Sequence, residues 1–337
     1  MRIVILYNKD LDRVISKFGR QNKELYDEKA IKRIEKIFLD HDYDVRLIDG
    51  NVDMFDKLRN VSNEKDMIPF VFNLAYGIQG ESRYTHIPSI LEMLGLPYFG
   101  SGPFGHTLAL DKIATKMLMK ENGIPTPDFR VFYSTDDLNK EVDFPAILKT
   151  AMETSSFGMK VVNNREELKE SAAGLFEDFE QPAFAERFIK GKEYALGLIG
   201  NLNDIEFLPV IENDLGDEGD KPYTSDQKKQ EPHTKPANLP EKMLNEMQQH
   251  AKALFRILRL RDYARVDMRI DDQGKYYFLE INSMAGLQST GFFMAAARIA
   301  GYTFEDMIIK LLDTGMQKYF TTHEKLRVRY NSKHKKS

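Results

Sequence analysis

The chain has 337 residues, of which 42% are hydrophobic, 30% are charged and none is Cys. This length exceeds what one ordinary hydrophobic core accommodates, so we expect two or three domains. The net charge of -4 argues against a dedicated nucleic-acid-binding protein, and the lack of Cys excludes disulfides, thiolate metal ligands and a cysteine nucleophile.

The first hundred residues alternate strand-like and helix-like segments. Apolar runs at 2–7, 44–49 and 68–74 predict strands, and periodic apolar patterns predict helices at 24–39 and 87–95. This alternation indicates a parallel sheet with helices on its faces. The first apolar run is too short for a signal peptide or a membrane span, so we expect a cytoplasmic protein.

The middle of the chain predicts a small α+β domain. A helix is expected at 108–123, where it meets the helix-stopping sequence IPTP. Short apolar segments predict strands at 145–150, 159–162 and 182–189, with a helix at 164–179 before the last strand.

The C-terminal part combines a long polar segment with helices and a basic tail. Residues 213–236 contain almost nothing apolar, which is typical of a linker or a functional lid. Helices are expected at 240–258 and 304–312. The tail at 317–337 is rich in Lys and Arg, and we expect it to be solvated and disordered rather than a site for nucleic acid or anionic lipid.

The segment ARVDMRIDDQGKYYFLEIN predicts a hairpin with one polar face. Arg265, Asp267 and Arg269 alternate with apolar residues in its first strand, and Glu280 and Asn282 do so in its second. A two-residue loop within DDQG pairs Asp267 with Glu280, and any even loop length keeps the acids on one face. Opposed like charges destabilise a sheet unless something compensates them. Oxygen ligands of this kind suit Mg²⁺, while a solvated strand face balanced by the two arginines is the alternative.

Two lysines and a loop are candidate phosphate-binding elements. Lys149 closes an apolar strand, and the loop after it includes Ser155, Ser156 and Gly158, whose backbone N–H groups are suited to cradle phosphate. An ordinary turn is the alternative, because the segment lacks the usual glycine patterns of nucleotide-binding loops. Lys112, in DKIATK, on its own predicts only a surface charge.

The order of these features resembles that of the ATP-grasp ligases, and within them the D-alanine–D-alanine ligase family. The similarity covers about residues 68–312 and rests on matching stretches in family order: FNLAYGIQGE, LEMLGLPYFGSGP, LALDKIATK, GIPTPDF, FPAILKTAMETSSFGM, AERFIKGKEYALGLIG, YARVDMRIDDQGKYYFLEINSMAGL and AAARIAGYTFEDMI. The resemblance implies the three-domain ATP-grasp fold, with α/β and α+β parts and ATP between the central and C-terminal domains. The implied parts are a parallel-sheet N-terminal α/β domain at 1–104, a central ATP-grasp subdomain at 105–190, a C-terminal ATP-grasp subdomain at 191–316 with a mobile loop at 213–236, and the basic tail at 317–337.

The resemblance also assigns roles to individual residues. Asp267, Glu280 and Asn282 match the ligands of Mg²⁺ (or Mn²⁺), and Arg265 with the Gly286 amide matches the pair that stabilises an oxyanion. A further set of residues matches the family's nucleotide-binding positions, which are the phosphate-binding lysines, the loop over the phosphates, the adenine hinge, the ribose-binding acid and a loop lysine. These residues are Lys112, Lys149, Glu153, Ser155, Ser156, Glu186, Arg187, Phe188, Ile189, Glu193 and Lys228 (or Lys229).

The activity that the resemblance implies is that of an ATP-dependent carboxylate–amine ligase. In this reaction the γ-phosphate of ATP is transferred to a carboxylate, and an amine attacks the acyl phosphate to give a peptide bond, ADP and phosphate. Within the phosphate loop, Ser155 matches a residue on the catalytic, substrate side. The expected partners are small amino-acid substrates, with no membrane and no nucleic acid, and family membership implies a homodimer.

The match fails on the amino-acid side. Glu24 is the candidate for the acid that meets the first ammonium group, with an ordinary helix residue as the alternative. Tyr76 replaces the family's His, and Arg83 replaces a Gly, where it is expected either to bind an acidic substrate or to be a surface arginine. Gly291 and Phe292 replace the Ser-Leu pair that receives the second D-alanine, which removes a hydroxyl and adds bulk. These departures suggest another amino-acid pair or a natural-product substrate, and a non-catalytic ATP-binding regulator is the alternative from another class.

Overall fold

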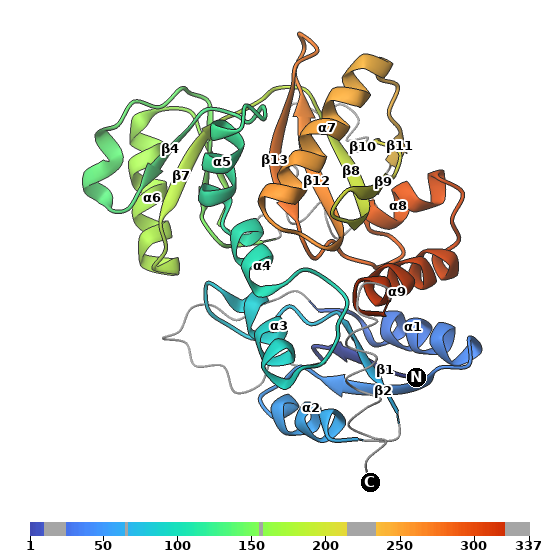
Figure 1. Cartoon of the computed structure of the whole chain (residues 1–337). Coiled ribbons are helices and arrows are strands. Elements are labelled where there is room, and N and C mark those ends of the chain that lie inside the picture. The colour runs from blue at the N-terminus through green and yellow to red at the C-terminus, as the bar shows by residue number, and fades with distance from the viewer. Residues whose placement is uncertain (10–24, 65–66, 155–157, 214–233, 321–337) are drawn as a thin grey trace.

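The computed structural model describes all residues except 10–24, 65–66, 155–157, 214–233 and 321–337. Its strands form three sheets, which lie in chain order at the bottom, the upper left and the upper right of Figure 1. The expected combination of α/β and α+β parts is confirmed. In the described part of the chain, no helix has both the length and the apolar character needed to cross a membrane.

The N-terminal sheet is parallel, as predicted, with the strand order β2-β1-β3. Its elements are β1 (Arg2–Tyr7), α1 (Glu28–Asp40), β2 (Asp44–Asp49), α2 (Met54–Ser62), β3 (Pro69–Asn73) and α3 (Arg83–Leu94). Alternate residues of β1 point to opposite faces, so Ile3 and Ile5 pack on the side of α1, whereas Val4 and Leu6 pack against α2 and α3. Helix α1 begins after Asp27, whose side chain accepts a hydrogen bond from the backbone N–H of Ala30 at 2.7 Å.

The predicted helix at 108–123 is wrong in one respect, because two helices occupy this region. Helix α4 (Pro103–Leu110) ends and α5 (Lys112–Glu121) begins at Asp111, whose backbone is extended. The Asp111 carboxylate accepts hydrogen bonds at 3.0 Å from the backbone N–H groups of Ile113 and Ala114, which stabilises the new helix start. The break places Lys112 in the first turn of α5.

The second sheet is antiparallel, with the order β4-β7-β5-β6. Its elements are β4 (Phe129–Phe132), the 3₁₀ helix η2 (Thr135–Asn139), β5 (Ala146–Thr150), β6 (Lys160–Val162), α6 (Arg165–Phe179) and β7 (Ala183–Arg187). One face is covered by the apolar side of α6, which contributes Leu168, Ala172 and Leu175 to a buried core. The opposite face is therefore left for contacts elsewhere in the molecule.

The third sheet has the order β11-β10-β8-β12-β13, with β9 paired to β8. Its elements are β8 (Lys192–Asn201), β9 (Asp204–Phe207), β10 (Ile211–Asn213), β11 (Thr234–Pro236), α7 (Glu241–Ile257), β12 (Asp262–Ile270), β13 (Tyr276–Asn282), α8 (Phe292–Ile299) and α9 (Phe304–Phe320). The two ends of the polar segment 213–236 are strand residues, because β10 and β11 pair with each other. Most of that segment lies outside the described residues.

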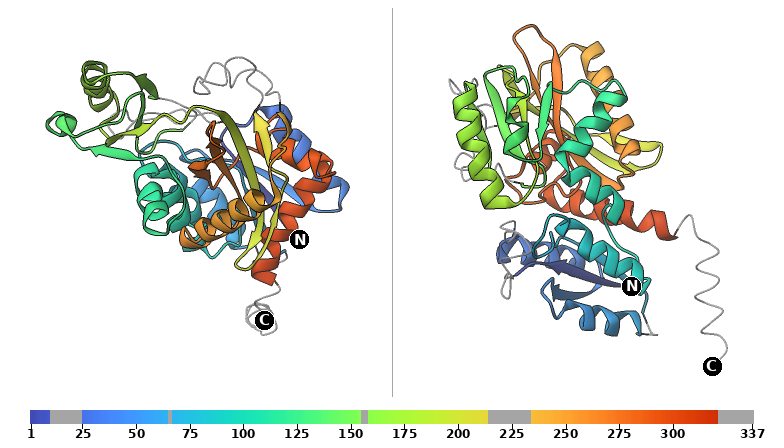
Figure 2. Two further views of the ribbon diagram at one scale, coloured as in Figure 1. Left: turned by 90° about the horizontal axis from the view of Figure 1, so that it is seen from above. Right: turned by 90° about the vertical axis from the view of Figure 1, so that its left-hand side faces the viewer.

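A column of stacked aromatic rings joins the N-terminal sheet to the third sheet. Phe72 of β3 stacks on Phe99 with 4.5 Å between ring centroids, and Phe99 stacks on Tyr263 of β12 at 4.9 Å. Helix α9 lies between the same two sheets, as Figure 1 and the right-hand view of Figure 2 show, and belongs to the same core. This packing fixes the end of β3 close to the strands that carry the acidic residues.

Candidate active site

A cleft of about 1070 Å³, partly open to solvent, is lined by residues of the second and third sheets and of α5. Its charged side chains are Lys112, Lys149, Glu153, Glu186, Arg187, Glu193, Arg265, Asp267, Arg269 and Glu280. Its apolar side chains are Ile147, Met159, Phe188, Ile189, Ala195, Ile211, Met268, Leu279 and Phe292. The structure thus brings together most of the described site residues that the sequence predicts, although they come from separate elements.

The two acids of the hairpin pair as predicted, but the pairing has a different cause from the one expected. Asp267 lies opposite Glu280, and Arg265 lies opposite Asn282. However, a register shift follows Asp267, because Met268 pairs with Phe278 and Leu279 is the extra residue of a β-bulge. The loop length is therefore odd, contrary to our expectation, and the bulge restores the pairing of the two acids.

Arg265 and Lys112 compensate the charge of this acidic pair. Arg265 donates to both carboxylate oxygens of Asp267 at 2.6 Å, and Lys112 Nζ lies 3.6 Å from Glu280 Oε2. Asn282 donates its amide N–H to Asp267 at 2.9 Å. In the alternative interpretation both Arg265 and Arg269 balance the two acids, but Arg269 instead pairs with Glu193 at 3.7 Å. Since only 16% to 23% of the Arg265 and Asp267 side chains is exposed, this pair is not a solvated strand face.

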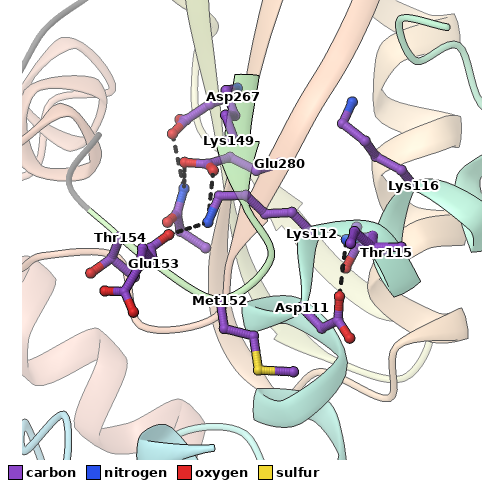
Figure 3. Close-up of polar contacts among 12 residues, drawn as sticks. Asp111, Lys112, Thr115, Lys116, Lys149, Met152, Glu153, Thr154, Asp267 and Glu280 are labelled. Carbon is purple, nitrogen blue, oxygen red and sulfur yellow. Dashed lines mark hydrogen bonds and ion pairs between the residues drawn. The ribbon is translucent and has the colours of Figure 1, made fainter. Parts of the chain in front are cut away.

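Lys112 is held where it reaches both the loop after β5 and the acidic hairpin. Its Nζ donates to the backbone carbonyl of Glu153 at 2.5 Å, and Figure 3 shows the side chain pointing toward Glu153 and Glu280. The Glu153 carboxylate accepts a hydrogen bond from Gln181 at 2.9 Å, and Gln181 was not predicted. A ligand that enters the cleft therefore meets a lysine whose position depends on three different elements.

Glu186 lies at the centre of a buried cluster of two lysines. Its two carboxylate oxygens lie 2.5 Å from Lys149 Nζ and 2.5 Å from Lys116 Nζ, and only 2% of its side chain is exposed. Burial alone raises the pKa of Glu186, but the two lysine charges outweigh burial and hold that pKa below its usual value. Lys116 was not predicted, because its burial depends on a carboxylate from another element and the local sequence carries no signal for that contact.

The predicted hinge at 186–189 consists of the end of β7 and the two residues after it, and it lies along the wall of the cleft. Phe188 lies under the guanidinium of Arg269, with 4.9 Å from Cζ to the ring centroid. Arg187 lies 5.3 Å from the ring centroid of Tyr277, and Ile189 is buried. Together with Leu279, which the bulge directs to the cleft, these residues form an apolar surface beside the Glu186 cluster.

Tyr76, which was predicted for the amino-acid side, belongs to a group of aromatic residues that does not line the cleft. Tyr76 is buried and stacks on Tyr26 with 5.8 Å between centroids, and the Tyr26 hydroxyl accepts a hydrogen bond from the backbone N–H of Leu287 at 2.9 Å. Tyr76 also packs against Tyr84 at 5.5 Å. The sequence did not single out Tyr26, because an aromatic residue before a helix carries no distinctive signal. This group joins the N-terminal sheet to the loop after β13.

Arg83 is not a surface arginine, contrary to one of our two expectations. Only 3% of its surface is exposed, and it donates hydrogen bonds at 3.2 Å to the Met152 carbonyl and to the Thr154 hydroxyl. Its guanidinium lies 3.9 Å from the Glu153 carboxylate. Arg83 therefore ties the start of α3 to the loop that leads into residues 155–157.

The residues around α8 differ in their access to the cleft. Gly291 is the N-cap of α8, and a Cβ placed there meets the Gly286 carbonyl oxygen at 3.1 Å. Phe292 lines the cleft, with its ring centroid 5.5 Å from the guanidinium carbon of Arg265. Gly286 is half-buried in the loop between β13 and α8. Four other predicted site residues lie outside the described residues: Glu24, Ser155, Ser156 and Lys228.

The acidic pair fits a magnesium ion that is bound together with a polyphosphate. Among the residues that the structure describes, no three His, Cys, Asp or Glu side chains are placed to hold a metal ion. The predicted set supplies only two carboxylates, Asp267 and Glu280, and the amide of Asn282. Mg²⁺ is usually bound by one or two carboxylates and completes its octahedral shell with waters and phosphate oxygens. The donor set is therefore suited to Mg²⁺ with a phosphorylated ligand and is too small for a cage made of protein alone.

Comparison with known proteins gives consistent matches along most of the chain. The sequence model described as "D-ala D-ala ligase C-terminus" matches residues 118–313. The D-alanine–D-alanine ligase of Pelotomaculum thermopropionicum is 32% identical over 80% of this chain and 86% of its own length. That of Aquifex aeolicus is 30% identical over 91% of this chain and 98% of its own length.

Two further matches concern a protein of unassigned role and a solved structure. An uncharacterized protein of Sinorhizobium fredii is 39% identical over 74% of this chain and 75% of its own length. The crystal structure of the D-alanine–D-alanine ligase from Bacillus anthracis complexed with ATP superposes with a TM-score of 0.70 at 21% identity, covering 94% of this chain and 98% of that one. At this identity the structural match shows a shared fold.

Proposed function

The chain belongs to the D-alanine–D-alanine ligase family of ATP-dependent ligases, which form carbon–nitrogen bonds, and from this premise we propose how its cleft performs such a reaction. The substrates are ATP and two amino acids, and the products are a dipeptide or related amide, ADP and phosphate. One observation carries the proposal: three strands and a helix converge so that two carboxylates, Asp267 and Glu280, face three cations, Lys112, Lys149 and Arg265, in one cleft.

The cations of the cleft bind and orient the triphosphate. Lys112 lies 3.6 Å from Glu280 and Lys149 lies 2.5 Å from Glu186, and each lysine is mostly buried, so their charges act with little screening by water. The base packs on the apolar surface of Phe188, Ile189 and Leu279, and Glu193 contacts the ribose. Positioning and charge stabilisation supply most of the rate in phosphoryl transfer, so fixed lysines are the expected devices.

Asp267, Glu280 and Asn282 would hold Mg²⁺, whose charge would offset the negative charge of the phosphates. Arg265 is already aligned by Asp267 through two hydrogen bonds, so its direction is fixed before a substrate arrives. Its charge is suited to stabilise the oxyanion that forms when the amine attacks the acyl carbon, together with the backbone N–H of Gly286. Ser155, Ser156 and Lys228 are proposed to close over the phosphates, and Glu24 to bind the first ammonium group.

A different amino-acid pair from two D-alanines is favoured by the residues around α8. Phe292 presents a ring to the cleft beside Arg265, where the family has a smaller residue after a serine. Gly291 offers no hydroxyl, and a site that recognises its substrate through a hydrogen bond loses much discrimination without it. We therefore propose that the acceptor amino acid is not D-alanine, and that Tyr76 and Arg83 shape the donor side.

The organisation of the protein follows from the same premise. We propose that 1–104, 105–190 and 191–316 act as three domains, the last of which continues to the end of α9 at Phe320. We also propose that the protein is cytoplasmic, because the reaction depends on ATP and free amino acids, which are available inside the cell. Family membership is the reason for proposing a homodimer.

Phosphate release tests the proposal directly. The purified chain is incubated with ATP and Mg²⁺ and with a panel of D- and L-amino acids, singly and in pairs, and the peptide product is identified by mass. Release with D-alanine alone supports the parent activity, and release only with other pairs supports the altered acceptor. Persistent ATP binding without release for any amine and carboxylate pair would contradict ligase activity.

A further inference from the structure

Lys116 is a fully buried lysine for which the proposed reaction has no role. Its side chain is 0% exposed on α5, whereas that of Lys120, one turn later on the same helix, is 50% exposed. It is absent from the lining of the cleft, so it is not placed to contact a ligand directly. Burying an ammonium group is costly unless it is paired and hydrogen-bonded, so the fold gains something specific from this charge.

The contacts of Lys116 connect two sheets. Its Nζ lies 2.5 Å from Glu186 Oε2 on β7 and donates to the Thr126 hydroxyl at 2.8 Å. That hydroxyl in turn donates to the carbonyl oxygen of Phe278 on β13 at 2.9 Å. The Glu186 carboxylate is thereby fixed relative to the hairpin that carries the acidic pair. Figure 3 shows that the Lys116 amine points away from the site to which Lys112, on the same helix, is directed.

Lys149 is the second partner of the same carboxylate and differs from Lys116 in one respect. Lys149 lines the cleft, so a phosphate group that enters can draw its ammonium away from Glu186. Without a further partner, that movement leaves a buried carboxylate uncompensated, which is strongly unfavourable. Lys116 is paired with Glu186 and does not line the cleft, so an entering phosphate has no direct access to it.

We propose that Lys116 is a positioning residue for nucleotide binding: it keeps the Glu186 carboxylate paired and in place, so that Lys149 is free to turn to the phosphates. The inference rests on the proposed function, since it assumes that the cleft binds ATP. Lys116 acts through Glu186 and touches neither nucleotide nor amino acid. Its removal should therefore affect nucleotide affinity and leave the chemical step nearly unchanged.

The test compares K116M with the wild type and with K120M, which removes a half-exposed lysine from the same helix. Among the residues that the structure describes, Lys149 is the cation that remains paired with the Glu186 carboxylate in K116M, so ATP must break that pair to bind. We expect the dissociation constant of MgATP, measured by calorimetry without amino acids, to rise about tenfold or more. The KM for ATP should rise in parallel, with kcat at saturating ATP within about twofold of the wild type. K120M should bind ATP as the wild type does.

A double-mutant cycle with E186Q separates this role from a purely structural one. In the E186Q background Lys149 is no longer held by a carboxylate, so adding K116M should change the ATP dissociation constant by less than about twofold. Thermal unfolding of every variant is measured alongside, and K116Q replaces K116M should the latter not fold. An unchanged affinity in K116M, or an equal loss in both backgrounds, overturns the inference. If the wild type itself binds no ATP, the proposed function fails instead.

Discussion

The two halves of the proposed active site are built in different ways. The half that we propose for the nucleotide consists mainly of strand residues in fixed register and of buried ion pairs, such as Glu186 with Lys149 and Asp267 with Arg265. The half that we propose for the amino acids includes residues such as Tyr76, which come from loops and helix ends far apart in the chain. The hydrogen-bonded register of the strands specifies the nucleotide half, whereas the amino-acid half depends on how separate elements pack. Substitutions can therefore change the amino-acid half while the nucleotide half is kept.

The largest effect is expected from Glu280, which belongs to the nucleotide half. E280Q removes one of two carboxylates available to Mg²⁺, so we expect turnover to fall by about 100-fold or more. The measurement is phosphate release at saturating ATP over a range of Mg²⁺ concentrations. E241Q, at an exposed position in the first turn of α7, is the matched control and should retain full activity. Wild-type turnover in E280Q would refute the metal assignment.

A smaller effect on activity is expected from substitution of Arg83. This substitution should weaken amino-acid binding more than ATP binding, so it tests whether the two halves are separable. R83M removes the hydrogen bonds to Met152 and Thr154, so the loop before 155–157 loses its tie to α3. We expect the KM for the amino-acid substrates to rise about tenfold, while the dissociation constant of MgATP changes less than about threefold. R59M, at an exposed position on α2, serves as the control. A comparable loss of ATP affinity would show that the two halves are not separable.

The smallest effect is expected at the start of α8. G291S combined with F292L should shift the ratio of kcat/KM for D-alanine over other acceptors by a few-fold to about tenfold, because a hydroxyl returns and the ring beside Arg265 is removed. The new Cβ at 291 meets carbonyl oxygens at 3.1 Å and 3.3 Å, so we expect a loss of about 1 kcal/mol in the free energy of unfolding. Competition assays with mixed acceptors measure the shift, and the two single variants show which residue causes it. An unchanged acceptor profile argues against Gly291 and Phe292 as pocket residues.

The sequence predicted most of the regular structure, because apolar periodicity encodes it directly. The parallel N-terminal sheet and the helix at α7 agree with the structure. The sequence did not predict the break at Asp111, since the apolar pattern continues across it. Only the hydrogen bonds that the Asp111 side chain accepts from the start of α5 mark the new helix. Helix α2 was not predicted, because its apolar positions are few and its flanks are polar. Helix α9 runs beyond the expected end at residue 312 to Phe320.

The candidate site was predictable only where one element carries the signal. The period-two pattern placed Asp267 and Glu280 opposite each other, yet the β-bulge at Leu279 has no signature in the sequence. Lys116 was missed because a lysine on a helix normally faces water, and its burial depends on a carboxylate from β7. The burial of Arg83 likewise depends on a loop from another sheet. Such contacts are tertiary and cannot be derived from local pattern.

A crystal structure with Mg²⁺ and a non-hydrolysable ATP analogue tests the central claim most directly. We expect a metal ion within about 2.0 to 2.2 Å of carboxylate oxygens of Asp267 and Glu280, bridging to phosphate oxygens. In the same structure Lys149 should contact a phosphate, while Lys116 stays paired with Glu186. Asp267 and Glu280 remote from both metal and phosphate, with the nucleotide bound elsewhere, would contradict the account.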